Sequence, residues 1–136
     1  MPSDECLARL ARARHGVLAT VHERRGVDAV PVVFALSDRR LILPVDTVKP
    51  KATTALQRLA NIDADPSACL LVDGWDEDWS RLWWVRASGR ARRLDGDELA
   101  PAIAALATRY GPYRRPGAVV AALELSIDEL RGWSAS

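Results

Sequence analysis

The sequence predicts a mainly β (α+β) fold, in which six short strands form a closed or split antiparallel barrel with helices packed on it. Segments with strand patterning follow one another through short turns, which is typical of hairpins. Three segments with helical spacing interrupt them, so the expected order is α-β-β-β-α-β-β-α-β. The 136 residues suit one domain that covers 1–136, because no linker or internal repeat divides them.

Apolar residues at spacings of three and four predict the helices. The first helix follows Ser3, which can cap it, and Gly16 ends it. The second helix is expected over 52–63 and the third over 99–110. Acidic residues in the first turn of the first helix favour it through the helix dipole.

The strands are predicted from alternating or continuous apolar residues between turn signals. They are expected at 16–22, 28–36, 41–46, 67–75, 82–94 and 118–126. Pro31 inside the second strand indicates an edge position or a bulge, since proline donates no hydrogen bond to a neighbouring strand. The continuous apolar middle of the fourth strand predicts burial on both faces. In the fifth strand, Trp83 and Trp84 point to opposite faces.

Composition excludes several classes of partner. The chain has 19 basic and 18 acidic residues, and this balance gives no electrostatic reason to bind nucleic acid or an anionic membrane. No apolar run approaches the roughly 20 residues that cross a bilayer, and the N-terminus does not resemble a signal peptide. A cytoplasmic location is therefore expected. Cys6 and Cys69 lack metal-ligand spacing, so we expect no metal site and a buried free thiol at Cys69.

Lys49 and Lys51 are the only lysines among the 19 basic residues, and they flank Pro50 just before the second helix. A cation at a helix N-terminus is disfavoured by about 0.3–1 kcal/mol. The pair becomes favourable if an anion binds there, because two ammonium groups and exposed helix N–H groups then converge on it. The alternative is a solvated loop with two incidental charges.

The segments GVLATV, VPVVFAL, LILPVDTVKPKATT and LWWVRASGRARRL, in this order, resemble the pyridoxamine 5′-phosphate oxidase-like split β-barrel superfamily. The similarity covers roughly residues 8 to 115. More narrowly, the chain resembles the actinobacterial branch of F420-dependent oxidoreductases. Flavin oxidases of the superfamily usually carry Arg-x-x-x-x-Lys near the phosphate, and Lys-Pro-Lys here favours the deazaflavin coenzyme F420 over FMN.

The resemblance implies a homodimer with two cofactor sites at the subunit interface and a hydride transfer between C5 of the deazaflavin and a small-molecule substrate. It implies that Lys49 and Lys51 bind the cofactor phosphate, with Arg58 as a weaker candidate. Trp84 and Arg86 would reach the site from the partner subunit. The residues expected to line the ring and ribityl chain are Thr20, Val21, Pro31, Val32, Pro44, Val45 and Asp46. No catalytic residue is assigned, and an FMN enzyme or a non-catalytic cofactor or haem binder stays an alternative.

Four tryptophans fall within ten positions and predict either a dimer interface or core wall, or a stacking wall for a planar ligand. They are Trp75, Trp79, Trp83 and Trp84. His15 and His22 flank the first strand and are expected to be structural or solvated, with a proton donor as the alternative. Tyr110 and Tyr113 are expected in packing and loops, with Tyr113 an outside candidate for the substrate mouth.

Overall fold

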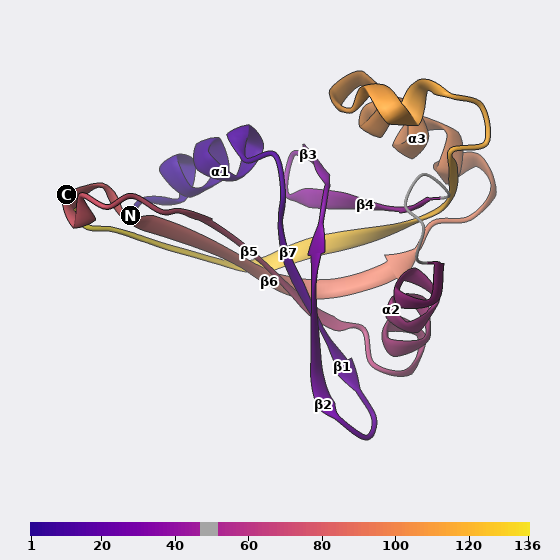
Figure 1. Cartoon of the computed structure of the whole chain (residues 1–136). Helices are drawn as coiled ribbons and strands as arrows, with labels where there is room; N and C mark the ends of the chain where they lie inside the picture. Colours follow the sequence, from indigo (N-terminus) through magenta and orange to yellow (C-terminus); the bar gives the residue numbers. More distant parts are fainter. Residues whose placement is uncertain (47–51) are drawn as a thin grey trace.

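The computed structural model describes residues 1–46 and 52–136, and these form one sheet with helices packed on it (Figure 1). The α-helices of the described part are α1 (Ser3–Arg12), α2 (Ala52–Ala64) and α3 (Leu99–Arg109). Short 3-10 helices lie between β5 and β6 (η1, Trp79–Arg81), before α3 (η2, Gly96–Glu98) and after it (η3, Gly111–Arg114). The strands are β1 (Gly16–His22), β2 (Gly26–Val32), β3 (Ala35–Ser37), β4 (Arg40–Asp46), β5 (Ser67–Gly74), β6 (Trp83–Arg93) and β7 (Val119–Ser134).

The seven strands pair in the order β2-β1-β5-β6-β7-β4-β3, and every pairing is antiparallel. The predicted mainly β architecture is confirmed, whereas residues 1–46 and 52–136 form seven strands and not six. The predicted strand 28–36 is divided, because its first part becomes β2 at one edge of the sheet and its last part becomes β3 at the other. The edge position that Pro31 predicted is confirmed, since β2 pairs with β1 alone.

The last strand is much longer than 118–126, because β7 continues to Ser134 and pairs with β6 from Leu123 to Ser134. The ladder shifts register between Ser88 and Gly89. A Cβ atom at Gly89 would lie 1.8 Å from the carbonyl oxygen of Ser126, so only glycine fits where the two strands approach. Beyond this register shift, the second half of β7 pairs with the first half of β6.

Two apolar cores hold the sheet. The first fills the inside of the coiled sheet and includes Leu10 of α1, Phe34, Leu70 and Leu125. The second lies between α3, η3 and the opposite side of β4 and β7, and Leu106 is fully buried in it. The helix α3 therefore covers only one end of the outer side of the sheet.

Several local expectations need correction. Pro2, not Ser3, occupies the N-cap of α1, which makes no side-chain capping bond, and the helix ends at Arg12. Burial of the fourth predicted strand on both faces is wrong within this chain, because Leu70 is buried while its neighbour Leu71 is 39% exposed. Cys69 is likewise half-buried and a free thiol. The helix α3 does not cover the outer side of β5, so the apolar residues on that side of β5 remain exposed or half-buried.

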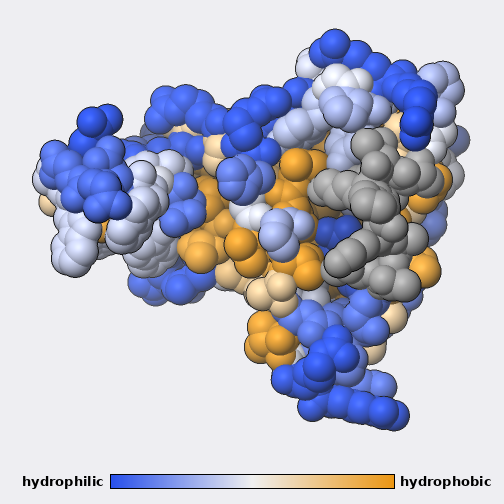
Figure 2. All heavy atoms as spheres, viewed as in Figure 1, coloured by the Kyte–Doolittle hydropathy of each residue, from blue (hydrophilic) through white to orange (hydrophobic). Residues whose placement is uncertain are grey.

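No helix in 1–46 or 52–136 is long and apolar enough to span a membrane. Figure 2 shows hydrophobic surface gathered over the middle of the molecule, below α1 and above the β1–β2 hairpin, while the hairpin tip and the α3 region are hydrophilic. On this face of the molecule, the apolar surface is therefore concentrated in the middle.

Candidate functional site

A polar hollow of about 340 Å³ lies between the β1–β2 hairpin and α2. We call it the α2 hollow, and it is lined by Thr20, Arg25, Asp28, Ala29, Val30, Gln57, Arg58 and Asn61. The helix provides three of these residues, Gln57, Arg58 and Asn61, from two adjacent turns, and the hairpin provides the others. The hollow is formed because α2 packs against β1 with its apolar residues Leu59 and Ile62, which turns its polar side toward the hairpin.

Asn61 organises the floor of this hollow. Its side-chain amide donates to Thr20 Oγ1 and to Asp28 Oδ2, each at 2.9 Å, and its oxygen accepts from Gln57 Nε2 at 2.9 Å. Asn61 and Thr20 are both only 4% exposed. A buried amide with these partners satisfied holds the hairpin and α2 in one relative position.

Asp28 carries a negative charge into the hollow. Arg25 donates to both of its carboxylate oxygens, at 3.1 and 2.8 Å. The bond from Arg25, and secondarily the bond from Asn61, lower the pKa of Asp28 below its ordinary value. Asp28 is therefore ionised at neutral pH and offsets the charge of Arg25. Arg58 is the second cationic side chain of this lining.

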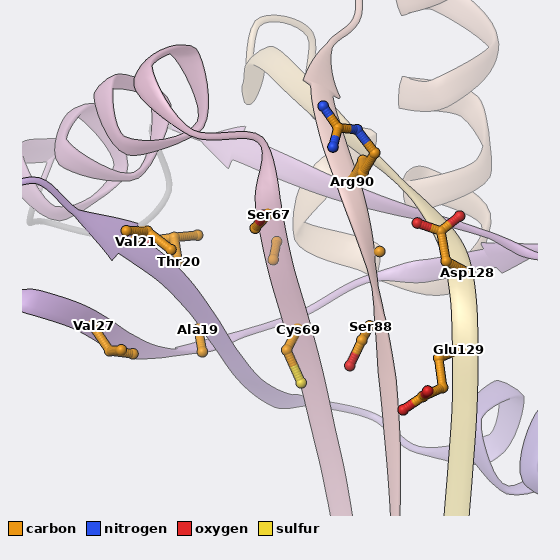
Figure 3. Close-up of a pocket in the computed structure, with 12 residues that line it drawn as sticks. Ala19, Thr20, Val21, Val27, Ser67, Cys69, Ser88, Arg90, Asp128 and Glu129 are labelled. Atoms are coloured by element: carbon orange, nitrogen blue, oxygen red, sulfur yellow. The ribbon is translucent and has the colours of Figure 1, made fainter.

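A second depression runs along the outer side of β1, β5, β6 and β7 and encloses about 510 Å³ (Figure 3). Its floor consists of small residues from neighbouring strands, since Ala19, Cys69 and Ser88 are direct cross-strand partners. Figure 3 shows the carboxylate of Glu129 directed from β7 toward Ser88, and Val27 at the opposite margin. This groove is shallow and mixed in polarity, which suits contact with another surface better than capture of a small ligand.

The groove belongs to a larger uncovered area that we call the open sheet face. Cross-strand partners share a face, so the register places Val17, Leu71, Arg86 and Arg131 in one row and Asp73, Trp84 and Trp133 in the next outward-facing row. Val17 and Leu71 are each 39% exposed, Trp133 is 46% exposed and Val27 is 68% exposed. Arg86 lies over the ring of Trp84, 5.3 Å from its centroid.

The predicted site residues separate into three groups. Thr20 and Arg58 line the α2 hollow, and Val21 lines the groove. Pro31, Trp84 and Arg86 lie on the open sheet face, on β2 and β6. Lys49 and Lys51 lie outside the described residues, as does the side chain of Asp46.

Val32, Pro44 and Val45 are buried, and the side chains of the two valines belong to the first core. These valines would therefore contact a ligand mainly through their backbone atoms, because their side chains are packed in the core.

Sequence reasoning missed Asn61, Asp28 and Trp133. Asn61 and Asp28 were indistinguishable from ordinary polar residues of a helix and a strand, because the bond between them spans 33 positions and the bond from Asn61 to Thr20 spans 41. Trp133 lies in what was expected to be a tail. The sequence signal for a strand here was the alternation of Leu130 and Gly132 with Arg131 and Trp133. This segment is too polar for that alternation alone to predict a strand.

Other candidates prove structural. His22 Nδ1 accepts from the backbone N–H groups of Arg24 and Arg25 at 3.0 Å each and stabilises the β1–β2 turn. Tyr113 is buried in the second core, so it does not border a substrate mouth in this chain. Within 1–46 and 52–136 no group of three His, Cys, Asp or Glu residues could hold a metal ion.

Known proteins share this architecture. A conserved hypothetical protein from Mycobacterium tuberculosis superposes with a TM-score of 0.78 at 20% identity, covering 99% of this chain and 86% of that one. An FAD-binding protein from Mesorhizobium loti gives 0.70 at 19% identity, covering 97% and 92%. A heme binding protein from Mycobacterium smegmatis gives 0.74 at 21% identity, covering 99% and 59%. These similarities show the fold alone.

A search among curated proteins found no match. The profile of the pyridoxamine 5′-phosphate oxidase family matches residues 2–134, nearly the entire sequence. This match agrees with the split, coiled sheet described above, and the chain therefore belongs to the pyridoxamine 5′-phosphate oxidase family.

Proposed function

We propose that this protein is an oxidoreductase that binds coenzyme F420 and transfers a hydride between C5 of the coenzyme and a small organic substrate. The observation that carries the proposal is the placement of α2, which positions Arg58 and the Asn61 network around a polar hollow. The start of this helix follows Lys49 and Lys51 in the sequence. A guanidinium on this helix and two lysines just before it in the sequence form a donor set that fits a phosphate-bearing cofactor.

The chain's own residues would bind and orient the cofactor. Arg58, together with Lys49 and Lys51, would hold the phosphate, and the bonded Asn61 amide would keep the hollow in shape. When bound, the reduced deazaflavin supplies the hydride. Asp28 is ionised because its pKa is lowered, so it cannot be the group that protonates a product at neutral pH.

We also propose that the protein is a homodimer that associates through the open sheet face. This face exposes Val17, Leu71 and Trp133 and lacks the cover that α3 provides at the other end of the sheet. Exposed apolar side chains gathered on one face are typical of protein interfaces. Trp84 and Arg86 would then border the cofactor of the partner and exclude water from it.

A flavin enzyme on the same fold is the second candidate function. Its support is the structural similarity to a Mesorhizobium loti protein described as FAD-binding. A non-catalytic haem binder is the third, supported by similarity to a Mycobacterium smegmatis protein described as heme-binding. Both use the same family fold with a different ligand.

Titration of the purified protein with F420, FMN and haem separates these candidates. Quenching of the tryptophan fluorescence by F420 at micromolar concentration, with weaker quenching by FMN, is the expected result. Tighter binding of FMN would move the assignment to a flavin enzyme, and a haem absorption band without F420 binding would indicate a haem binder. Absence of binding by all three would overturn the proposal.

A further inference from the structure

A third depression, of about 190 Å³, lies between the first two turns of α3 and the outer side of β4 and β7. We call it the α3 pocket. It shares no lining residue with the α2 hollow or with the groove of Figure 3. Figure 1 shows α3 and the β1–β2 hairpin at opposite ends of the view, so the α3 pocket is remote from the hairpin that borders the proposed cofactor site.

The floor of the α3 pocket is apolar and belongs to the second core. Ile42 on β4, Leu94 after β6 and Ala102 on α3 are all buried there. Glu124 interrupts this floor, because it is the direct cross-strand partner of Ile42. Two positions earlier on the same side of β7, Ala122 is packed in the second core. A carboxylate therefore lies where the apolar core would otherwise continue.

Glu124 is buried with few partners. Among residues 1–46 and 52–136, the buried polar or charged residues are Thr20, Asn61 and Glu124, and Thr20 is bonded to Asn61. Glu124 is only 8% exposed, and its one ion pair in these ranges joins it to Arg92 at 3.4 Å. Arg92 donates its two shorter bonds, of 3.0 and 2.6 Å, to Glu98 instead. A carboxylate offers about four acceptor positions, so Glu124 retains acceptor positions beside the pocket.

A cation also borders the pocket. Arg40 precedes Ile42 by two positions on β4, so it lies diagonally opposite Glu124 on the same side of the sheet. Arg40 is exposed, and the ion pairs of the described part of the chain do not include it. Its charge acts at longer range on Glu98, where it contributes to lowering the pKa of that carboxyl. Arg40 and Glu124 thus border one cavity without pairing to each other.

The charges around the α3 pocket cancel. Two cations and two carboxylates lie at its margin, namely Arg40, Arg92, Glu98 and Glu124. The adjacent β3–β4 turn adds one charge of each sign, Asp38 and Arg39. A ligand with a net charge gains little from such a field, whereas a ligand with one charge of each sign can satisfy both Glu124 and Arg40.

We propose that the α3 pocket binds a small α-amino acid with an aliphatic side chain. The ammonium group donates to Glu124, and the carboxylate accepts from the guanidinium of Arg40. The side chain packs against Ile42, Leu94 and Ala102. The volume is below the roughly 300–1,000 Å³ of pockets for larger ligands, which limits the occupant to a few heavy atoms. The site involves no cofactor and does not depend on the proposed function.

Titration of the ¹⁵N-labelled protein with L-valine tests the site. We expect saturable shifts of the amide signals of Ile42, Leu94 and Ala102 at millimolar valine, with the signals of Thr20 and Asn61 in the α2 hollow unchanged. Shifts that do not saturate, or that centre on the α2 hollow, would overturn the inference.

Two valine analogues test the pairing of charges without altering the protein. Isobutylamine lacks the carboxylate and isovalerate lacks the ammonium group, so each is expected to bind about tenfold or more weakly than valine. Isobutylamine that bound as tightly as valine would show a simple cation site, and isovalerate that did so would show an anion site. Either result would overturn the assignment of an amino acid.

Variants test the two charged residues. Glu124→Gln keeps the shape of the side chain and is expected to weaken valine binding about tenfold or more, since the buried carboxylate is lost. Arg40→Gln should weaken it about two- to fivefold, because this cation is exposed. Arg39→Gln, at an exposed position outside the α3 pocket, is the matched control and should bind as the parent does.

Arg40→Gln and the analogue series decide the question even if Glu124→Gln does not fold, because neither alters the core. Parental affinity in Arg40→Gln, or in a folded Glu124→Gln protein, would overturn the inference.

Discussion

Asn61 shows how one buried amide determines the shape of the candidate site. It joins a helix to two strands through two hydrogen bonds, to Thr20 and Asp28, and a third bond links it to Gln57 within the helix. We expect Asn61→Ala to lower the free energy of unfolding by about 2–3 kcal/mol, because Thr20 and Asp28 lose a buried donor. Urea denaturation measures this change.

Gln57→Ala is the control for that experiment, because Gln57 donates to Asn61 from the half-buried margin. A loss below about 1 kcal/mol is expected for it. Equal losses in the two variants would mean that Asn61 does not organise the hollow.

Acid stability provides a test of Asp28. Its folded-state pKa is lowered, chiefly by Arg25 and then by Asn61, so the unfolded chain binds protons first as the pH falls. The stabilisation is thus complete above the ordinary aspartate pKa and is lost as the pH falls through the lower, folded value. The urea midpoint of Asp28→Asn should therefore change less between neutral pH and about pH 3 than that of the parent.

Asp97→Asn is the comparison variant, since Asp97 is exposed and lies outside the α2 hollow. Its midpoint is expected to follow the parent's through the same pH range. An Asp28→Asn variant that also followed the parent would show that the Arg25 and Asn61 bonds do not hold in solution.

The lysine pair remains a prediction from the sequence, because Lys49 and Lys51 lie outside the described residues. Replacing either by alanine should weaken F420 binding by about 1.5–3 kcal/mol, the range for hydrogen bonds to charged groups. Fluorescence titration measures the change, and Arg12→Ala on α1 is a control that removes a cation remote in the sequence. Normal binding by both lysine variants would leave the pair as solvated charge.

At the scale of elements, the close approach of β6 and β7 depends on Gly89. Any side chain there meets the Ser126 carbonyl, and backbone atoms on both strands would have to move. We expect Gly89→Ala to destabilise the protein by about 3 kcal/mol or more, or to prevent folding. Gly111→Ala is the matched control, because nothing lies within 4 Å of its Cβ position.

Thermal unfolding monitored by circular dichroism compares the two glycine variants. An unchanged midpoint for Gly89→Ala would mean that β7 does not bend along β6 as described. A second consequence is that the outer half of β7 would lose its register, since the shift occurs beside this residue.

Most elements could be predicted from local patterns. The predicted bounds were wrong where pairing with a strand distant in the sequence determines the bounds of a strand. The apolar spacing of α1, α2 and α3 was sufficient to find them. The break in 28–36 was not visible, because β2 and β3 are separated by the different partners they take, β1 and β4. The polar second half of β7 becomes a strand only because β6 pairs with it.

At the scale of the whole molecule, the open sheet face predicts association. Leu71 lies at the centre of this face beside Val17. We expect Leu71→Asp to convert a dimer into a monomer, because a carboxylate in the apolar centre of an interface is desolvated without a partner. Analytical ultracentrifugation measures the mass, with Val120→Asp as the control at an exposed position beyond this face.

A Leu71→Asp protein that still sedimented as a dimer would assign the interface to another surface. A parent protein that was itself monomeric would overturn the proposed dimer. Binding of cofactor by Leu71→Asp should also fall, since Trp84 and Arg86 would no longer reach a partner.

The sequence by itself determined the fold class, the family and most of the elements, because periodicity, turn residues and ordered motifs are local properties. It also pointed to Thr20 and Arg58, which line the α2 hollow. Only the tertiary structure decided that Asn61 and Asp28 complete the hollow, that β7 reaches Ser134, and that Val17, Leu71 and Trp133 share an uncovered face. These features arise from contacts between residues far apart in the chain, and such contacts leave no periodic signal in the sequence.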